Sequence, residues 1–272
     1  KKLSKIGIQM TYVTPEPETI NKFLEEYTFE RIEEWFNKLI TGFKRWTDYT
    51  FDERHKRTES IRELKFPYEY REGQKNLCVS VYRAIEDNTN LYIQAPTGVG
   101  KTLSTVFPAV QALGQQMSDK IFYLTSKTIT RTVAEDTYAI LRDNGLHMRT
   151  VTLTAKDKIC PLDERNCNPV ACPYAKGHFD RINDAVYDII TSQMVIGRDN
   201  VMEYANRHNV CPFEMSLDMS LFSDAVICDY NYLFDPYVHL KRFFAEGTKG
   251  PYLFLVCLLY TSPSPRDRQK SR

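Results

Sequence analysis

The chain has 272 residues, of which 42% are hydrophobic and 12% aromatic, enough to bury one substantial core or one core plus a smaller satellite domain. The 36 Lys and Arg residues nearly cancel the 35 Asp and Glu residues, so overall charge gives no argument for nucleic-acid binding, which must come from local placement of charge. The longest apolar run, residues 252–260, has about half of the roughly 20 residues that a membrane span requires, which excludes such a span.

The N-terminus shows no secretory signal, because Lys1 and Lys2 are followed by polar and charged residues. We therefore expect a soluble, cytoplasmic protein that does not associate with membranes. In that compartment the seven cysteines are expected to be thiols or metal ligands rather than disulfides.

The first 46 residues predict a strand, a return strand and a helix. Residues 6–12 alternate apolar and polar side chains, and a second strand is expected at 20–24 after the turn at 14–17. Thr28 is a candidate N-cap for an amphipathic helix from Phe29 to Trp46. Residues 47–65 are highly charged and predict a helix or linker.

From Phe66 onward, apolar strand-like segments alternate with helical segments, which predicts an α/β fold with a parallel sheet and crossover helices. The expected strands are Leu91–Gln94, Ile121–Leu124, Arg149–Leu153, Ala225–Cys228 and Tyr252–Val256. An insertion at about 156–213 separates the third of them from the fourth.

The strongest motif is residues 95–102, Ala-Pro-Thr-Gly-Val-Gly-Lys-Thr, which follow an apolar segment and open a helical one. This is the context of a Walker A loop, whose glycines let backbone N–H groups surround phosphates at a helix N-terminus. Lys101 is expected to reach the β- and γ-phosphates, and the Thr102 hydroxyl to ligate Mg²⁺. We predict an ATP–Mg²⁺ site with Lys101 and Thr102 as the catalytic residues and with Thr97, Gly98, Val99 and Gly100 as further nucleotide-binding residues.

An aromatic residue followed by Arg71-x-x-Gln74 lies upstream of this loop. The arrangement resembles the Q motif of superfamily-two helicases, in which the Gln reads the adenine edge and favours ATP over GTP. We therefore expect Arg71 and Gln74 to belong to the nucleotide site.

Four cysteines are confined to the insertion: Cys160, Cys167, Cys172 and Cys211, separated by 6, 4 and 38 residues. This is not the paired spacing of ordinary zinc ribbons. Thiolates suit both Zn²⁺ and iron–sulfur clusters, and the spacing does not decide between them.

Taken together, the motifs resemble the XPD/DinG family of iron–sulfur superfamily-two helicases over residues 66–256. The segments that carry the resemblance are the Q-like motif, residues 95–102, Leu124–Thr128, Leu153–Cys160 and residues 172–180, and Asp229–Leu233 is similar to a Tyr-Asn-Tyr-Leu segment of the family. The resemblance implies a RecA-like motor domain, a [4Fe–4S] cluster on the four cysteines, and 5′-to-3′ translocation on single-stranded DNA. It also implies a bacterial DNA-repair setting.

By the same resemblance, Thr125, Lys127 and Thr128 contact the DNA backbone, and single-stranded or forked DNA is the expected partner. Basic residues around the cysteines could add a local cationic path for phosphates: Lys156, Lys158, Lys176, His178 and Arg181. An ordinary solvated polar insertion explains any one of them equally well. Oligomeric state is not predicted.

The expected domain boundaries are 1–60, 61–256 and 257–272. Residues 1–60 are similar to the end of a RecB-type nuclease domain together with a linker, and they contain no metal-binding carboxylate motif. Residues 61–256 form the ATP-binding domain with its insertion. Residues 257–272 have the character of a non-native tail that resembles translated adaptor sequence.

That tail begins where a Walker B acid pair is expected, directly after the apolar strand at 252–256. The residue there is Cys257, and without the acids the chain is expected to bind ATP weakly and hydrolyse almost none.

Two other functions remain open at this point. A zinc-stabilised nucleic-acid-binding module with a vestigial nucleotide site would be colourless and contain zinc. A nuclease would need carboxylates that the chain does not show. RNA helicases lack the cysteine insertion.

Overall fold

The computed structural model describes residues 3–15, 17–96, 98–125, 128–245 and 250–257. The chain divides into two compact units, Lys1–Arg54 and His55–Arg272, and the boundary falls within helix α1 (Phe29–Glu63). Among the described residues, no helix combines the length and hydropathy that a bilayer span requires.

The first unit holds an antiparallel hairpin of β1 (Lys5–Pro15) and β2 (Glu18–Thr28), followed by α1. The predicted strand pair and helix are confirmed. Thr28 caps the helix as expected, because its Oγ1 accepts a hydrogen bond from the Arg31 N–H at 3.4 Å. The charged segment 47–63 continues the same helix, so it is helix and not linker.

The second unit contains a five-stranded sheet of order β5-β4-β6-β3-β7 in which all pairs are parallel. Its strands are β3 (Lys120–Thr125), β4 (Thr150–Thr152), β5 (Val195–Ile196), β6 (Ala225–Asp229) and β7 (Tyr252–Val256). The predicted α/β class is confirmed, and the arrangement is consistent with a RecA-like motor domain.

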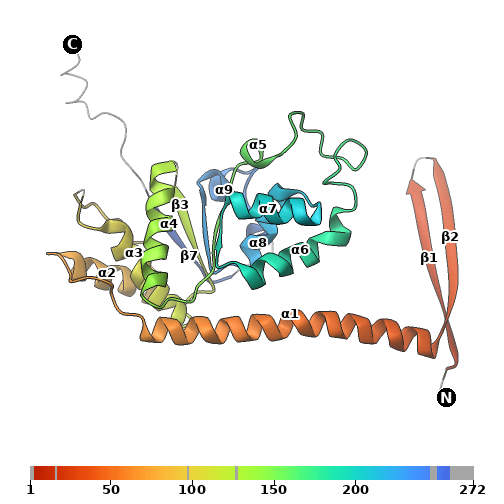
Figure 1. The fold of residues 1–272 in the computed structure, drawn as a ribbon, viewed down its shortest axis with the longest axis horizontal. Helices are drawn as coiled ribbons and strands as arrows, with labels where there is room; N and C mark the ends of the chain where they lie inside the picture. The colour runs from red at the N-terminus through yellow and green to blue at the C-terminus, as the bar shows by residue number, and fades with distance from the viewer. Residues whose placement is uncertain (1–2, 16, 97, 126–127, 246–249, 258–272) are drawn as a thin grey trace, which may run out of the picture. The chain divides into compact units, whose positions relative to one another are not determined.

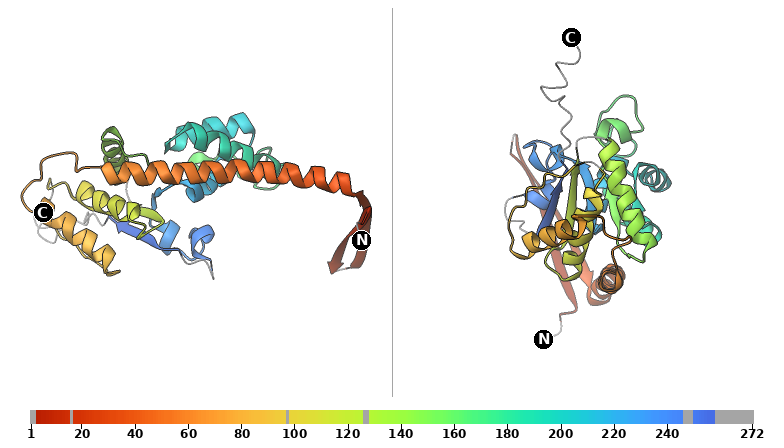
Figure 2. Two further views of the ribbon diagram at one scale, coloured as in Figure 1. Left: turned by 90° about the horizontal axis from the view of Figure 1, so that it is seen from below. Right: turned by 90° about the vertical axis from the view of Figure 1, so that its left-hand side faces the viewer.

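Helices lie on both faces of this sheet (Figures 1 and 2). Besides α1 they are α2 (Gln74–Glu86), α3 (Lys101–Gly114), α4 (Thr128–Asp143), α5 (Lys156–Ile159), α6 (His178–Ser192), α7 (Arg198–His208), α8 (Pro212–Phe222), α9 (Asn231–Phe234) and α10 (Lys241–Phe244). The end of α1 packs with α3 and α4 in the main core.

Strand alternation assigns side chains to the two faces. Ile121 and Tyr123 of β3 join the main core, whereas Phe122 packs on the opposite face against Phe243 of α10, with ring centroids 5.2 Å apart. Burial of each such apolar side chain contributes about 1.5–3 kcal/mol to folding.

The strand expected at Leu91–Gln94 is not formed. Tyr92 is 91% exposed, and the segment pairs with no strand among the described residues. An apolar segment that pairs with no strand edge gains no ladder hydrogen bonds, whatever its composition. That prediction was therefore wrong for this structure.

The range 156–213 is only partly an insertion. Val195 and Ile196 form β5, which pairs with β4 at one end of the sheet. A strand of two residues carries no alternation to detect, which is why the sequence did not indicate it.

Candidate nucleotide and cysteine sites

The sequence-predicted phosphate loop lies beside the carboxyl end of β3. The Tyr123 side chain, near the end of that strand, is hydrogen-bonded with the side chain of Thr102 in the first turn of α3. Burial raises the pKa of Tyr123 well above its usual value, and neighbouring Cys257 raises it further. The free N–H groups of the α3 N-terminus and the strand end thus share one edge of the sheet, where parallel α/β folds bind ligands.

The loop itself has the geometry that its glycines permit. Gly98 and Gly100 adopt positive φ angles of 87° and 72°. The Lys101 Nζ donates hydrogen bonds to the carbonyl oxygens of Ala95 at 2.9 Å and Pro96 at 2.7 Å. Val99 is half-buried, and Thr97 lies outside the described residues. The lysine is thus held at the loop and would exchange these carbonyls for phosphate oxygens.

Arg71 and Gln74 meet this loop directly. The Arg71 guanidinium donates to the Gly98 carbonyl, and the Arg71 N–H donates to Gln74 Oε1 at 3.0 Å. Gln74 is only 5% exposed, and a Cβ added at Gly100 would lie 2.6 Å from its Nε2. Two segments far apart in the sequence therefore form one site, and the positive φ of Gly100 favours glycine at that position.

The predicted DNA-contacting residues follow β3. Thr125 is 2% exposed, and its hydroxyl is hydrogen-bonded with that of Thr130 in α4. Thr128 is the first residue of α4, its side chain is outside the described part of the chain, and Lys127 is outside it altogether. Thr125 is thus placed to orient the start of α4.

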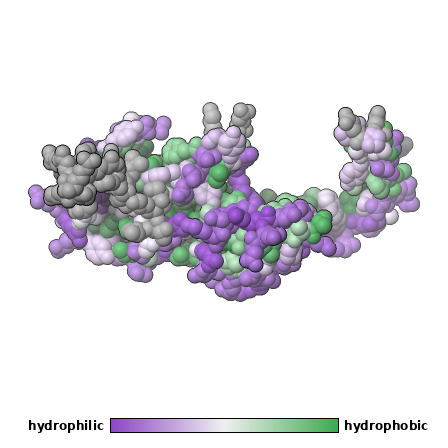
Figure 3. All heavy atoms as spheres, turned by 90° about the horizontal axis from the view of Figure 1, so that it is seen from above, coloured by the Kyte–Doolittle hydropathy of each residue, from purple (hydrophilic) through white to green (hydrophobic). Residues whose placement is uncertain are grey.

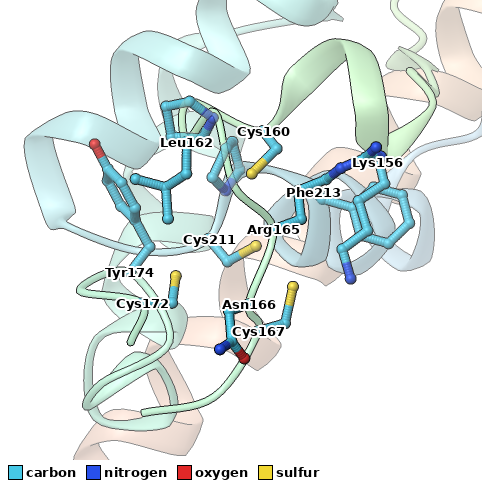
Figure 4. A pocket seen from close by; sticks show the side chains of 12 residues that line it. Lys156, Cys160, Leu162, Arg165, Asn166, Cys167, Cys172, Tyr174, Cys211 and Phe213 are labelled. Atoms are coloured by element: carbon cyan, nitrogen blue, oxygen red, sulfur yellow. The ribbon is translucent and has the colours of Figure 1, made fainter. Parts of the chain in front are cut away.

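All four insertion cysteines line one hollow (Figure 4). Cys160 follows α5, and Cys211 is the N-cap residue of α8. Cys172 lies in a turn, and its N–H donates to the Asn168 carbonyl at 2.9 Å. In the close-up, their sulfur atoms point into the shared space. The topology therefore brings together residues that are up to 51 positions apart.

The surroundings of the thiols are both charged and apolar. A hydrogen bond with Cys167 raises the pKa of Lys156, whose Nζ lies 5.5 Å from the Phe213 ring centroid. Burial raises the pKa of Cys211, while the N–H groups of Glu214 and Phe213 oppose that shift. In the described part of the chain, no three His, Cys, Asp or Glu side chains gather closely enough to hold a single metal ion.

Two members of the expected cationic path have other partners. His178 is 6% exposed, and its Nδ1 accepts a hydrogen bond from the Cys211 N–H at 3.2 Å. The Arg181 guanidinium donates to the carbonyl oxygens of Lys176, His208 and Asn209. Their role as phosphate contacts is therefore not supported, because both satisfy backbone groups inside the fold. Lys158 and Lys176 remain exposed.

Sequence reasoning missed Tyr123 and expected another role for His178 and Arg181. Tyr123 looked like an ordinary strand residue, since nothing in a strand pattern reports a neighbour on a distant helix. His178 and Arg181 are three positions apart, a spacing that places them on one helix face, but their backbone targets could not be read from the sequence.

Comparison with known proteins gives matches over the second unit. Residues 127–243 match the DEAD_2 family profile and residues 73–166 match the DEAD/DEAH box helicase profile. A Methanocaldococcus jannaschii protein named as a probable ATP-dependent helicase is 28% identical over 167 residues, covering 60% of this chain and 25% of that protein. An Anopheles gambiae homologue of regulator of telomere elongation helicase 1 is 20% identical over 228 residues, covering 64% of this chain and 23% of that protein.

Two solved structures also align with the chain. A structure titled XPD helicase has 16% identity and a TM-score of 0.48, covering 68% of this chain and 32% of its own. A truncated XPD has 16% identity and a TM-score of 0.43, covering 60% of this chain and 47% of its own. The chain spans about a quarter of the length of the curated relatives it matches.

Proposed function

We propose that the chain is the ATP-binding motor half of an ATP-dependent DNA helicase of the XPD/DinG type, because residues 127–243 match the DEAD_2 profile and residues 73–166 match the DEAD/DEAH box helicase profile. The observation that carries the proposal is the meeting of Arg71 and Gln74 with the phosphate loop at the start of α3. This contact joins a base-reading group to a phosphate-binding helix N-terminus in one site.

In this proposal each residue has a defined task. The backbone N–H groups of residues 98–102 bind the phosphates, and Lys101 moves from the Ala95 and Pro96 carbonyls to the β- and γ-phosphates. The Thr102 hydroxyl ligates Mg²⁺, and Gln74 reads the adenine edge. Lys127 and Thr128 contact the backbone of single-stranded or forked DNA, with 5′-to-3′ movement as the family resemblance implies. The buried Thr125 orients the start of α4 beside them.

We further propose that Cys160, Cys167, Cys172 and Cys211 hold a [4Fe–4S] cluster. Their shared hollow and their thiolate chemistry support this assignment. The cluster would link the end of α5 with the start of α8, and would thereby hold the insertion against the sheet. The alternative is zinc in a nucleic-acid-binding module, which the same donors could serve.

The nucleotide assignment is tested by MgATP titration of the purified chain. We expect Lys101→Ala to weaken binding by about tenfold or more, since a charge-assisted phosphate contact is lost. Lys241→Ala, an exposed lysine on α10, is the matched control and should bind as wild type does. Equal affinities of wild type and Lys101→Ala would contradict the proposal. Hydrolysis is expected to be negligible in all three.

The cluster assignment is tested by anaerobic purification with iron, sulfide and zinc analysis. We expect about four irons and four sulfides per chain, lost together in Cys172→Ser but retained in Cys78→Ser, a buried cysteine of α2. Zinc in place of iron would support the alternative function.

A further inference from the structure

Two side chains on the first turn of α6 contact the segment that leads into Cys211. His178 and Arg181 are three residues apart and therefore lie on the same face of the helix. Cys172 lies just upstream of the same helix. The first turn of α6 therefore links the segment after Cys172 with the segment before Cys211 through hydrogen bonds.

His178 contacts Cys211 itself. Its Nδ1 accepts the hydrogen bond of the Cys211 N–H, which requires the imidazole proton to be on Nε2. The ring is buried, so a lost acceptor would leave this amide without its partner in a nearly dry environment. This contact fixes the backbone of Cys211, which directly precedes α8.

Arg181 holds two chain segments, the one that follows Cys172 and the one that precedes Cys211. Its guanidinium donates to the Lys176 carbonyl at 2.7 Å and to the Asn209 carbonyl at 2.7 Å. Lys176 lies four residues after Cys172, and Asn209 lies two residues before Cys211. Gly177 makes room for this approach, because a Cβ there would lie 2.6 Å from an Arg181 terminal nitrogen.

We infer that His178 and Arg181 are positioning residues that hold the Cys211 backbone in register with Cys172, so that the ligand geometry exists before the metal group binds. The inference rests on the proposed cluster. It assigns to two basic side chains a role in cluster retention instead of DNA contact, because their hydrogen-bonding groups face carbonyls and an amide of the fold.

The experiment compares variants of the full chain in two states. In the metal-free protein, hydrogen exchange reports protection of the Cys211 amide. In the iron-loaded protein, the absorbance decay in the presence of a chelator under anaerobic conditions reports cluster loss. The variants are His178→Leu, which removes the acceptor, and His178→Asn, whose Oδ1 can replace Nδ1. Arg181→Met is tested in the same way, and Asn183→Ala, an exposed position on the same helix, is the control.

We expect His178→Leu and Arg181→Met to lose the cluster about tenfold faster or more, as removal of outer partners of metal ligands typically does. His178→Leu should also lose amide protection at Cys211, while His178→Asn and Asn183→Ala behave as wild type. Loss of the cluster in His178→Leu at the wild-type rate would overturn the inference. A wild-type chain without iron would contradict the cluster itself, and an unprotected wild-type Cys211 amide would overturn the positioning role independently.

Discussion

Cys257 occupies the place where an acidic residue was expected. Its N–H donates to the Leu124 carbonyl at 3.0 Å, which continues the pairing of β7 with β3 by one residue. Its side chain lies beside the Tyr123 hydroxyl, which also contacts Thr102. A thiol there cannot replace a carboxylate as a partner for Mg²⁺, which prefers oxygen ligands.

Cys257→Asp should therefore increase the affinity for MgATP by about tenfold relative to ATP with EDTA, since a carboxylate would face the Thr102 hydroxyl. The measurement is nucleotide titration with and without Mg²⁺. Cys257→Asn is the matched control of similar size without charge. If Asn and Asp behave alike, the position does not serve the metal.

Lys120 is a second residue with a testable electrostatic environment. Its ammonium donates to the Ser223 carbonyl, and burial lowers its pKa from 10.5 to about 8, with Asp224 opposing and Arg57 adding to the shift. Between pH 8 and 10.5 the unfolded chain keeps this proton and the folded chain loses it. The unfolded state then binds more protons, so the penalty present below pH 8 disappears as the pH rises.

We expect the free energy of unfolding of wild type to rise relative to Lys120→Met by roughly 2 kcal/mol between pH 7.5 and 9.5. Urea denaturation of both proteins at the two pH values measures this difference directly. A difference that stays constant, or that moves in favour of the variant, would show that the amine keeps its proton in the fold.

At the scale of elements, the contact of α1 with α3 depends on one glycine. A Cβ at Gly114, the last residue of α3, would lie 2.3 Å from Cγ2 of Ile61, which is 1% exposed. Either the helices separate or the Ile61 side chain leaves its preferred rotamer.

Gly114→Ala should destabilise the second unit by about 1–3 kcal/mol despite the better helix propensity of alanine. Ile61→Ala should restore part of this loss in the double variant, which a double-mutant cycle in urea would detect. Gly42→Ala, in α1 with open space around it, is the opposite control and should be neutral or stabilising.

The elements also show where sequence reasoning succeeds. Apolar runs at 121–124 and 225–228 were sufficient to locate β3 and β6, because strands buried on both faces carry no polar side chains. The same kind of run at Leu91–Gln94 failed, since pairing is decided by the neighbouring edge and not by the segment itself. In the described residues, β7 pairs only with β3 and leaves its other edge without a partner strand.

At the scale of the whole molecule, the residue types of the nucleotide and cysteine sites could be predicted from the sequence, but much of their geometry could not. The phosphate loop and the cysteines were found from local motifs. The contact of Gln74 with Gly100 and the hydrogen bond from the Cys211 N–H to His178 depend on packing between distant segments, which single-sequence patterns do not encode.

The first unit presents a different problem. Its hairpin and the first part of α1 carry large apolar side chains that stay exposed, with Met10, Phe23 and Trp35 between 58% and 62% exposed. Hydrophobic side chains are visible at this surface in Figure 3. The predicted amphipathic periodicity of residues 29–46 is thus correct, while the core it would normally cover is not formed by the described residues.

The strand order of the sheet has a consequence for the time course of synthesis. β6 lies between β3 and β4, yet it is made about 75 to 100 residues after them. β3 therefore has no partner strand until residue 229 has left the ribosome, whereas the four insertion cysteines emerge earlier. The four thiols thus leave the ribosome before β3, β4 and β6 can join in one sheet. In parallel sheets such late central strands make folding slow, so the order of the strands lengthens the time during which the thiols are open to oxidation before the sheet forms.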